Sequence, residues 1–314
     1  MSIENHSAVS EFILQGFTEN PKLKVPIFIF FLLIYIITVV SNLGIILLIR
    51  MDTQLHTPMY FFLSNLAFID FCYSSNIIPK ALEIFLAQKK TISFTGCIMQ
   101  IYFFDALAST ELILFALMAY DRYVAICNPL LYPCLMSYAQ CFKMAGGAFT
   151  AGFLNSVIHT TLVGTLSFCH SNEVNHFFCE IPRLLKLSCS KIFITEIFLF
   201  ICAAINLLGS LLIILSSYIH ILLTLFKMNS VVGRQKAFST CISHLIVVFI
   251  FYGTGLFIYL QPSSNFSDDL NKTVSLFYAF IIPMLNPLIY SVRNKEVKDS
   301  LKRAMNRNLF LHLK

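Results

Sequence analysis

The sequence contains little charge and no tryptophan. Only 12% of its 314 residues are charged, whereas 57% are hydrophobic, and soluble domains have about a quarter of their residues charged. The mean hydropathy is +0.77. A soluble protein of this composition would have too little polar surface to cover itself. The shortage of charge therefore excludes an ordinary water-soluble protein and indicates that most of the surface faces lipid.

The chain also lacks internal repeats, low-complexity tracts and long polar segments that would separate independent domains. Residues 1–25 are polar and acidic, and they lack the basic start and cleavage site of a removable signal peptide. We therefore expect the first apolar segment to act as the insertion signal. The longest polar region is the loop at about 165–193.

Seven apolar segments approach or exceed the ~20 residues that a helix needs to cross a bilayer. The fourth is the weakest, because it is rich in small residues (AGGAFTAGFLNS, 145–156), which suit close contact between helices inside a bundle. This pattern predicts an all-α membrane protein with a seven-transmembrane helix bundle over residues 26–292. The segments are 26–49, 58–80, 97–121, 141–164, 194–226, 237–260 and 272–292.

The charges are distributed asymmetrically between the two sides of such a bundle. With the N terminus outside, the inner side has thirteen basic and four acidic residues, and the outer side has nine of each. This is the asymmetry of the positive-inside rule. Residues 1–25 then form an extracellular tail and 293–314 a cytoplasmic segment. The basic excess indicates contact with anionic lipid or an acidic partner, not with nucleic acid.

The N-glycosylation sequons agree with this orientation. Sequons begin at Asn5, Asn265 and Asn271, all on the side assigned to the outside. We expect Asn5 and Asn265 to be acceptors, because Asn271 lies close to the bilayer.

Four cysteines also fall on the outer side, where they predict two disulfides. They are Cys97, Cys169, Cys179 and Cys189, and the spacing leaves three pairings open. An alternative is a metal site that includes His170 and His176. Zinc would need reduced thiolates, which an oxidising compartment disfavours.

The segment after Arg293 predicts a short amphipathic eighth helix on the inner membrane surface. Its apolar residues recur every four positions, opposite basic ones. These residues are Val297, Leu301 and Met305 against Lys298, Lys302 and Arg303. No cysteine follows Cys241, which excludes palmitoyl anchoring of this helix.

Polar residues and a proline occur at two places in the apolar segments, where they are unusual and require a physical explanation. Asp121–Arg122–Tyr123 stands at the inner end of the third segment, where the guanidinium can reach interfacial water and pair with the carboxylate. The alternative is an ordinary interfacial anchor. In the seventh segment Pro287 removes a helical hydrogen bond, and Asn286 is placed to satisfy the freed polar groups.

Taken together, the motifs resemble the rhodopsin-like G-protein-coupled receptors and, within them, the vertebrate olfactory receptors of the tetrapod type. The resemblance covers nearly the whole chain. It is carried by SNLGI (41–45), LHTPMYFFLSNLAFID (55–70), MAYDRYVAIC (118–127), SY (217–218), KAFSTCISHL (236–245) and PMLNPLIYSVRN (283–294).

This resemblance implies the disulfides Cys97–Cys179 and Cys169–Cys189. It also implies that Asp121 restrains Arg122 until the inner half of the sixth helix moves outward to admit a G-protein α subunit. His244 is either a proton switch or a neutral packed histidine. The residues assigned to coupling and activation are Asp121, Arg122, Tyr123, Tyr218, Lys236, His244, Asn286, Pro287 and Tyr290.

Two further expectations concern the interior. Asp70 and Glu111 lie at depth in the second and third segments, where carboxylates need a cation, a proton or polar partners. The resemblance implies a sodium site there, with Asn42 and Asn286 nearby and carboxyl protonation as the alternative. Because the chain has no tryptophan, the usual tryptophan switch is absent, and Tyr252 is the candidate in its place.

The resemblance also implies a pocket for a small, mostly apolar volatile ligand in the outer half of the bundle. The expected lining is Phe104, Asp105, Ala108, Ser109, Cys202, Asn206, Tyr252, Gly255, Tyr259, Leu276 and Ala279. Asp105 could pair with an amine ligand, face Glu180 or His159, or extend toward water.

The leading hypothesis is an odorant receptor of the plasma membrane that activates a stimulatory, olfactory-type G protein and raises cyclic AMP. The alternative is an ion-conducting or transporting protein, since buried carboxylates also mark ion paths. The sequence shows no inverted repeats or paired broken helices of a transporter. It also offers no nucleophile–base pair or metal motif that would predict an enzyme.

Overall fold

The computed structural model describes residues 9–17, 20–87, 89–169, 171–190, 192–228, 231–259 and 268–312. The predicted glycosylation sites Asn5 and Asn265 lie outside these ranges. The side chains of Lys236, Tyr259 and Asn271 also lie outside the described part.

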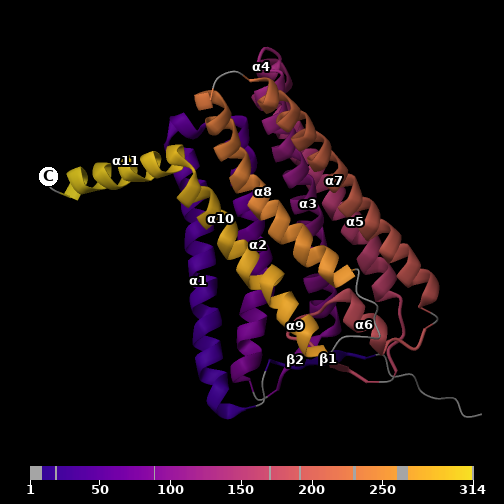
Figure 1. The fold of residues 1–314 in the computed structure, drawn as a ribbon. Coiled ribbons are helices and arrows are strands. Elements are labelled where there is room, and N and C mark those ends of the chain that lie inside the picture. The colour runs from indigo at the N-terminus through magenta and orange to yellow at the C-terminus, as the bar shows by residue number, and fades with distance from the viewer. Residues whose placement is uncertain are drawn as a thin grey trace, which may run out of the picture.

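The described chain is a bundle of long helices, which confirms the predicted fold class (Figure 1). Six of the seven predicted segments are single long helices. They are α1 (Pro21–Met51), α2 (Pro58–Leu86), α3 (Phe94–Cys127), α5 (Tyr138–Gly164), α7 (Phe193–Lys227) and α8 (Val231–Tyr259). The shortest of them has 27 residues, about 40 Å at 1.5 Å per residue, which exceeds the ~30 Å core of a bilayer.

Local sequence signals explain where several helices begin. Asn20 caps α1 by accepting a hydrogen bond at 3.1 Å from the Lys22 amide, and Ser93 caps α3 by accepting one at 3.1 Å from the Gly96 amide. Prolines occupy the first turns of α1 and α2, where a missing N–H costs no intrahelical bond. Pro79 lies inside α2 without ending it, so α2 extends past the predicted end at residue 80.

The seventh segment is built from three pieces: α9 (Asp268–Leu276), the π-helical turn η2 (Phe277–Ile281) and α10 (Ile282–Arg293). Pro287 in α10 cannot donate to the carbonyl of Pro283, four residues earlier. The Asn42 Nδ2 of α1 donates to that carbonyl at 2.9 Å. The structure therefore gives to Asn42 the role that the sequence analysis gave to Asn286.

Helix α3 lies at the centre and packs against α2, α5, α7 and α8. Its contact with α5 depends on Gly152, because a Cβ built there would lie 2.2 Å from Thr110 Oγ1 and 2.6 Å from the Ala106 carbonyl oxygen. The small residues of the fourth segment thus serve close helix contact, as predicted.

The outer surface of the bundle is apolar. Among the described residues, five helices are long and apolar enough to cross a membrane, and a shorter apolar stretch spans Cys241–Leu256 of α8. Helix α5 is not among them, which agrees with its small and polar composition. On α7, large side chains such as Phe200, Ile205 and Phe226 are exposed. Such a surface is stable in lipid and would aggregate in water.

One end of the bundle, which we call the disulfide end, carries a three-stranded sheet of β1 (Glu11–Leu14), β2 (Thr91–Ser93) and β3 (Glu173–Val174). The strand order is β2-β1-β3, with β1 antiparallel to β2 and parallel to β3. The disulfides here are Cys97–Cys179 and Cys169–Cys189, the pairs that the resemblance implies. Residues 11–14, assigned to a polar tail, instead bury Phe12 and Leu14 against the loops.

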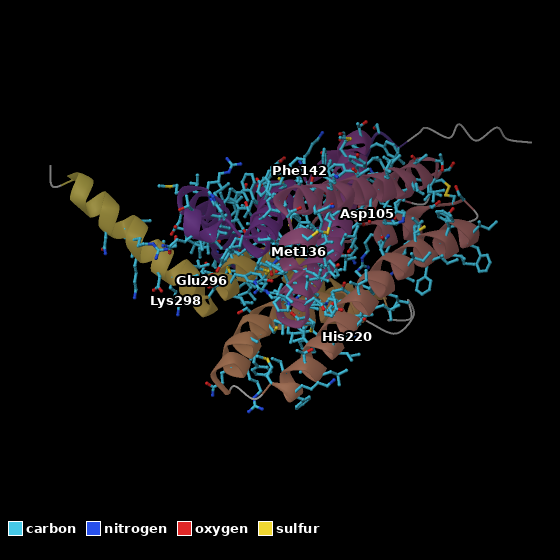
Figure 2. The ribbon with its side chains drawn as sticks, turned by 90° about the horizontal axis from the view of Figure 1, so that it is seen from above. Asp105, Met136, Phe142, His220, Glu296 and Lys298 are labelled. Carbon is cyan, nitrogen blue, oxygen red and sulfur yellow. A yellow bond between two sulfur atoms is a disulfide. The ribbon has the colours of Figure 1, made fainter. Side chains whose placement is uncertain are left out.

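The opposite end, which we call the α11 end, carries the 3₁₀ turn η1 (Thr53–Leu55), the short helix α4 (Tyr132–Leu135) and α11 (Lys295–His312). Helix α11 extends sideways from the bundle (Figures 1 and 2). Val297 is buried at its start, while Leu301 and Met305 are exposed. The Arg303 side chain donates to Asp52 at 2.6 Å, which fixes α11 to the bundle.

We predict that Gly152→Ala destabilises the protein, because the added methyl group meets the backbone of α3. Overpacking of this kind costs about 1–3 kcal/mol. Thermal unfolding of purified protein should show a lower Tm. Gly147→Ala in the same helix is the matched control, because its Cβ meets nothing within 4 Å and alanine favours helix. An equal effect of both variants would contradict the close α3–α5 contact.

We predict that Cys97→Ser reduces surface delivery strongly, because the Cys97–Cys179 bond fixes the loop to the start of α3. Removing a native disulfide typically costs about 2–5 kcal/mol. Surface labelling of intact cells measures the effect. Cys134→Ser is the control, since that thiol is free and exposed. Normal delivery of Cys97→Ser would show that the bridge is dispensable.

Candidate functional site

A cavity of about 140 Å³ lies inside the bundle toward the disulfide end. An apolar cavity of ~150 Å³ holds one benzene molecule, so this cavity fits a ligand with about one ring. Its lining consists of Tyr73, Phe104, Asp105, Ala108, Ser109, Leu112, Asn155, His159, Glu180, Ile181, Pro182, Ala203, Asn206, Leu207, Phe251, Thr254, Gly255 and Tyr278.

Aromatic rings form one wall of the cavity around Phe104. The ring centroid of Phe104 lies 5.2 Å from that of Tyr73, 5.5 Å from that of Phe178 and 5.9 Å from that of Tyr278. These spacings are typical of tilted and edge-to-face pairs. The wall therefore presents a rigid apolar surface to a ligand.

Six of the predicted ligand-binding residues line the cavity: Phe104, Asp105, Ala108, Ser109, Asn206 and Gly255. The other four whose side chains are described, Cys202, Tyr252, Leu276 and Ala279, are not among the lining residues. Tyr252 instead donates a hydrogen bond at 2.7 Å to Ser210, which joins α8 to α7.

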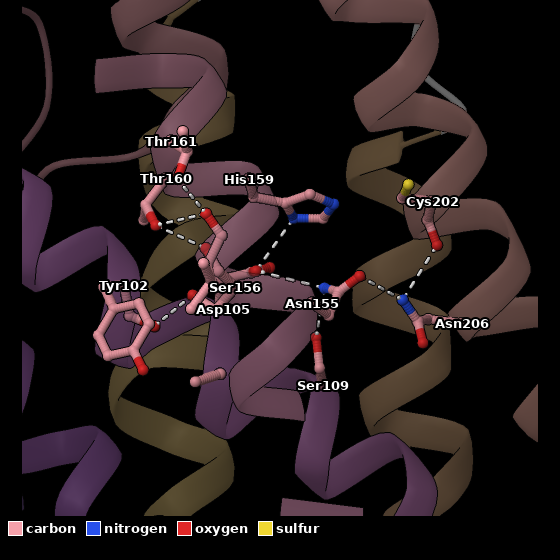
Figure 3. A network of polar contacts seen from close by, with 12 residues as sticks. Tyr102, Asp105, Ser109, Asn155, Ser156, His159, Thr160, Thr161, Cys202 and Asn206 are labelled. Carbon is pink, nitrogen blue, oxygen red and sulfur yellow. Dashed lines mark hydrogen bonds and ion pairs between the residues drawn. The ribbon is translucent and has the colours of Figure 1, made fainter. Parts of the chain in front are cut away.

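A chain of polar side chains crosses three helices beside the cavity (Figure 3). The Asn155 Nδ2 of α5 donates at 3.3 Å to Asp105 Oδ2 and at 3.2 Å to Ser109 Oγ, both on α3. On α7, the Asn206 Nδ2 donates at 3.1 Å to Asn155 Oδ1 and at 3.0 Å to the Cys202 carbonyl oxygen. Asn155 therefore connects α3 to α7.

His159 completes this network on α5. Its Nδ1 lies 3.0 Å from Asp105 Oδ2, so of the roles considered for Asp105 the structure shows the contact with His159. The distance suits a hydrogen bond, but the two groups are not aligned for one, so the contact is electrostatic. Nε2 is buried, and no described residue makes a hydrogen bond to it.

The loop before α6 (Ile181–Leu187) covers the cavity. The Cys179 amide, beside the disulfide, donates at 2.9 Å to Gln100 Oε1 of α3. The next residue, Glu180, accepts a hydrogen bond from Tyr278 of η2. Burial raises the pKa of the Glu180 carboxyl, and the hydrogen bond from Tyr278 acts in the opposite direction. The loop is thus held to both α3 and the seventh helix.

Sequence reasoning missed much of the lining on α5, α8 and the seventh helix. Asn155 was seen only as part of a small-residue stretch, although a polar side chain at that depth is itself a signal of an internal network. His159 was considered only as a partner of Asp105. No sequence signal distinguishes Phe251 or Leu112 from other apolar residues on their helices.

Two buried carboxylates lie deeper in the bundle. Asp70 is 1% exposed and Glu111 3% exposed. The Asn286 Nδ2 donates to both oxygens of Asp70, at 3.1 and 3.0 Å, and to Glu111 Oε1 at 3.3 Å. One neutral amide thus connects two acids. Asn42 Oδ1 is buried without a hydrogen-bond partner.

The predicted coupling motif lies at the α11 end of α3. The Arg122 Nε lies 3.9 Å from Asp121 Oδ2, an ion pair without a hydrogen bond. Tyr132 of α4 donates at 2.9 Å to Asp121 Oδ1, a contact that the sequence analysis did not anticipate. Burial and the adjacent Asp121 raise the pKa of Tyr132. Asp121 is therefore restrained by two groups.

Near the same end, the Tyr218 hydroxyl of α7 lies 2.7 Å from His244 Nδ1 of α8. Both side chains are buried, and the second nitrogen of His244, Nε2, has no hydrogen-bond partner among the described residues. The same holds for the buried Tyr290 hydroxyl of α10. The contact between Tyr218 and His244 joins α7 to α8.

Comparisons with known proteins agree with this architecture. The olfactory receptor family matches residues 31–308. Olfactory receptor 5F1 of Homo sapiens is 54% identical over 307 residues, covering 98% of each chain. Olfactory receptor 8U9 of Mus musculus is 54% identical over 301 residues, covering 96% of each chain. Olfactory receptor 8U8 of Homo sapiens is 53% identical over 312 residues, covering 99% of this chain and 98% of the relative. The chain therefore belongs to the olfactory receptor family, a family of membrane receptors and not of enzymes.

Proposed function

We propose that this receptor binds a small, mostly apolar volatile molecule in the cavity at the disulfide end and activates a stimulatory, olfactory-type heterotrimeric G protein. Activation then raises cyclic AMP. The observation that carries the proposal is that one helix, α3, lines the cavity at Asp105 and ends at the Arg122 motif. The two sites are seventeen residues apart, which is about 25 Å along a helix.

The lining of the cavity supports a mostly apolar ligand. Phe104, Leu112, Leu207 and Phe251 face it from three different helices, and apolar burial supplies most of the binding free energy in such sites. The ligand is enclosed by helices and by the loop that carries Glu180. A small displacement of α8 against α3 at the cavity would therefore change the helix packing along the whole bundle.

The α11 end supports coupling to a protein partner. Arg122 is 18% exposed there, and its contact with Asp121 lacks a hydrogen bond, so it can be exchanged for a new partner. Tyr218 and His244 hold α7 and α8 together nearby. Outward movement of α8 would separate this pair and open the space beside Arg122. The residues that take part in this movement are Tyr123, Lys236, Pro287 and Tyr290.

We further propose a plasma-membrane location with the N terminus outside. Both disulfides lie at one end, which suits an oxidising compartment. The other end carries helix α11 (Figure 1). The basic residues of α11 and the end of α3 that contains Arg122 therefore lie there, as the positive-inside rule requires of a cytoplasmic face. Asn5 and Asn265 remain proposed glycosylation sites on the outer side.

We also propose that Asp70 and Glu111 hold a sodium ion when α8 is in its inward position. The donor set fits, because the two carboxylates share one neutral amide, Asn286, which carries no charge to balance theirs. A bound cation would offset the negative charge that is otherwise unfavourable at this depth.

We predict that Arg122→Ala reaches the cell surface and abolishes agonist-dependent cyclic AMP production. The guanidinium is the group that the G protein would engage. Its Nε makes no hydrogen bond to the described residues of the bundle. A cyclic AMP reporter in cells measures this, with surface labelling alongside.

Lys143→Ala is the control for Arg122→Ala, since Lys143 is an exposed base at the α11 end of α5. It should signal normally. Full signalling by Arg122→Ala would show that the assigned role is wrong. Ligand-gated charge movement without G protein would instead favour the ion-transport alternative.

We predict that sodium raises the Tm of the purified wild-type receptor relative to choline, and that Asp70→Asn removes this effect. Losing one carboxylate halves the negative charge of the site. Glu83→Gln, a more exposed acid on the same helix, should keep the response. A wild-type Tm that changes with pH and not with sodium would show that the carboxyl groups hold protons instead.

A further inference from the structure

Most hydrogen-bond donors of the polar network beside the cavity already have acceptors within the protein. An amide side chain has two N–H donors. Asn155 directs both to α3, at Asp105 and Ser109. Asn206 directs both to Asn155 and Cys202. Neither amide has an N–H left for a ligand.

Two other polar residues of the lining are also engaged as donors. The Thr254 hydroxyl donates to the carbonyl oxygens of Ile250 and Phe251, each at 2.9 Å. The Tyr278 hydroxyl donates to Glu180. Ser109 keeps a rotatable hydroxyl that can donate or accept, so it does not discriminate between ligands.

His159 provides the acceptor. Nδ1 and a carboxylate oxygen 3.0 Å apart would repel each other if both presented lone pairs, so Nδ1 carries the proton. In the singly protonated ring, Nε2 is then an acceptor. Nε2 is buried and has no hydrogen-bond partner in the described part of the chain, and the ring points from α5 toward α7 beside the cavity (Figure 3). An unsatisfied buried polar atom is unfavourable, and a ligand that supplied a donor would relieve this.

We propose that the ligand carries a hydroxyl group, as an alcohol or phenol, that donates a hydrogen bond to His159 Nε2. This inference rests on the proposed function, because it names the class of odorant for the same cavity. Asp105 is a positioning residue here, since it fixes which ring nitrogen holds the proton.

The alternatives fit less well. A ketone, ester or ether has acceptors only and would present a lone pair to Nε2. An ammonium group would have to lose its hydration in a cavity with mainly aromatic and aliphatic walls. Asp105 Oδ2 already has contacts from His159 and Asn155. A hydroxyl group satisfies Nε2 without bringing a charge into the cavity.

Matched pairs of one-ring compounds test this. We would measure the Tm of the purified receptor in lipid nanodiscs with phenol against anisole, with benzyl alcohol against benzyl methyl ether, and with benzylamine. We expect the hydroxyl member of each pair to reach half-maximal stabilisation at a concentration at least about tenfold lower than its ether. Equal potency within the pairs, binding of benzylamine alone, or no binding of any compound would overturn the proposal.

His159→Phe keeps an aromatic ring and removes the acceptor. We expect this variant to bring the ratio of the half-maximal concentrations of the hydroxyl compound and its ether close to one, while ether binding persists. Asp105→Asn, which removes the charge that fixes the tautomer, should also lower the ratio, and it serves if His159→Phe does not fold. Thr161→Val is the control on the same helix, because Thr161 is exposed and its hydroxyl donates within the helix, to the Val157 carbonyl oxygen. An unchanged ratio in both pocket variants would contradict the assignment of His159 as the acceptor for the ligand hydroxyl.

The Tm readout separates this inference from the proposed function. It reports binding alone, whereas a cyclic AMP assay on cells with the same compounds reports coupling. Hydroxyl-selective stabilisation without any cyclic AMP response would support the recognition proposal and contradict the coupling proposal. An equal cyclic AMP response to the hydroxyl compound and its ether would support the coupling proposal and contradict the recognition proposal.

Discussion

A helix in lipid has no solvent to satisfy its buried polar groups, and this constraint accounts for much of the interior. Pro287 leaves the carbonyl of Pro283 without its helical donor, and Asn42 supplies one from another helix. Asn286 is then available to bridge Asp70 and Glu111. Several polar side chains in the bundle bond to a partner on a different helix, so these contacts also fix how the helices sit against one another.

The close approach of α3 and α5 is what brings the cavity and its polar network together. With only a hydrogen at Gly152, α5 can lie against Ala106 and Thr110. This places Asn155, one turn further along α5, within reach of Ser109 on α3. The same helix α3 continues to the Arg122 motif, so the ligand and the protein partner that we propose would act on one rigid element.

Several features followed from sequence, and others did not. The family resemblance implied Phe104, Asp105, Ala108 and Ser109 of α3, which all line the cavity. The same reasoning proposed Cys202 and Ala279, which do not line it, because the rotation of α7 and of the π-helical turn cannot be read from hydropathy. Asn155 was overlooked, since a small-residue stretch shows that a helix packs closely but not which side chains meet there.

The sequence by itself determined the apolar helical segments, the excess of basic residues on one side of the bundle and membership of the olfactory receptor family. These depend on sums along the chain and on motifs, which are local properties. Only the tertiary structure decided which polar groups meet: Asn42 with Pro283, Tyr132 with Asp121, and His159 with Asp105. Such contacts depend on the depth and rotation of each helix, and these are fixed by side-chain packing between segments far apart in the chain.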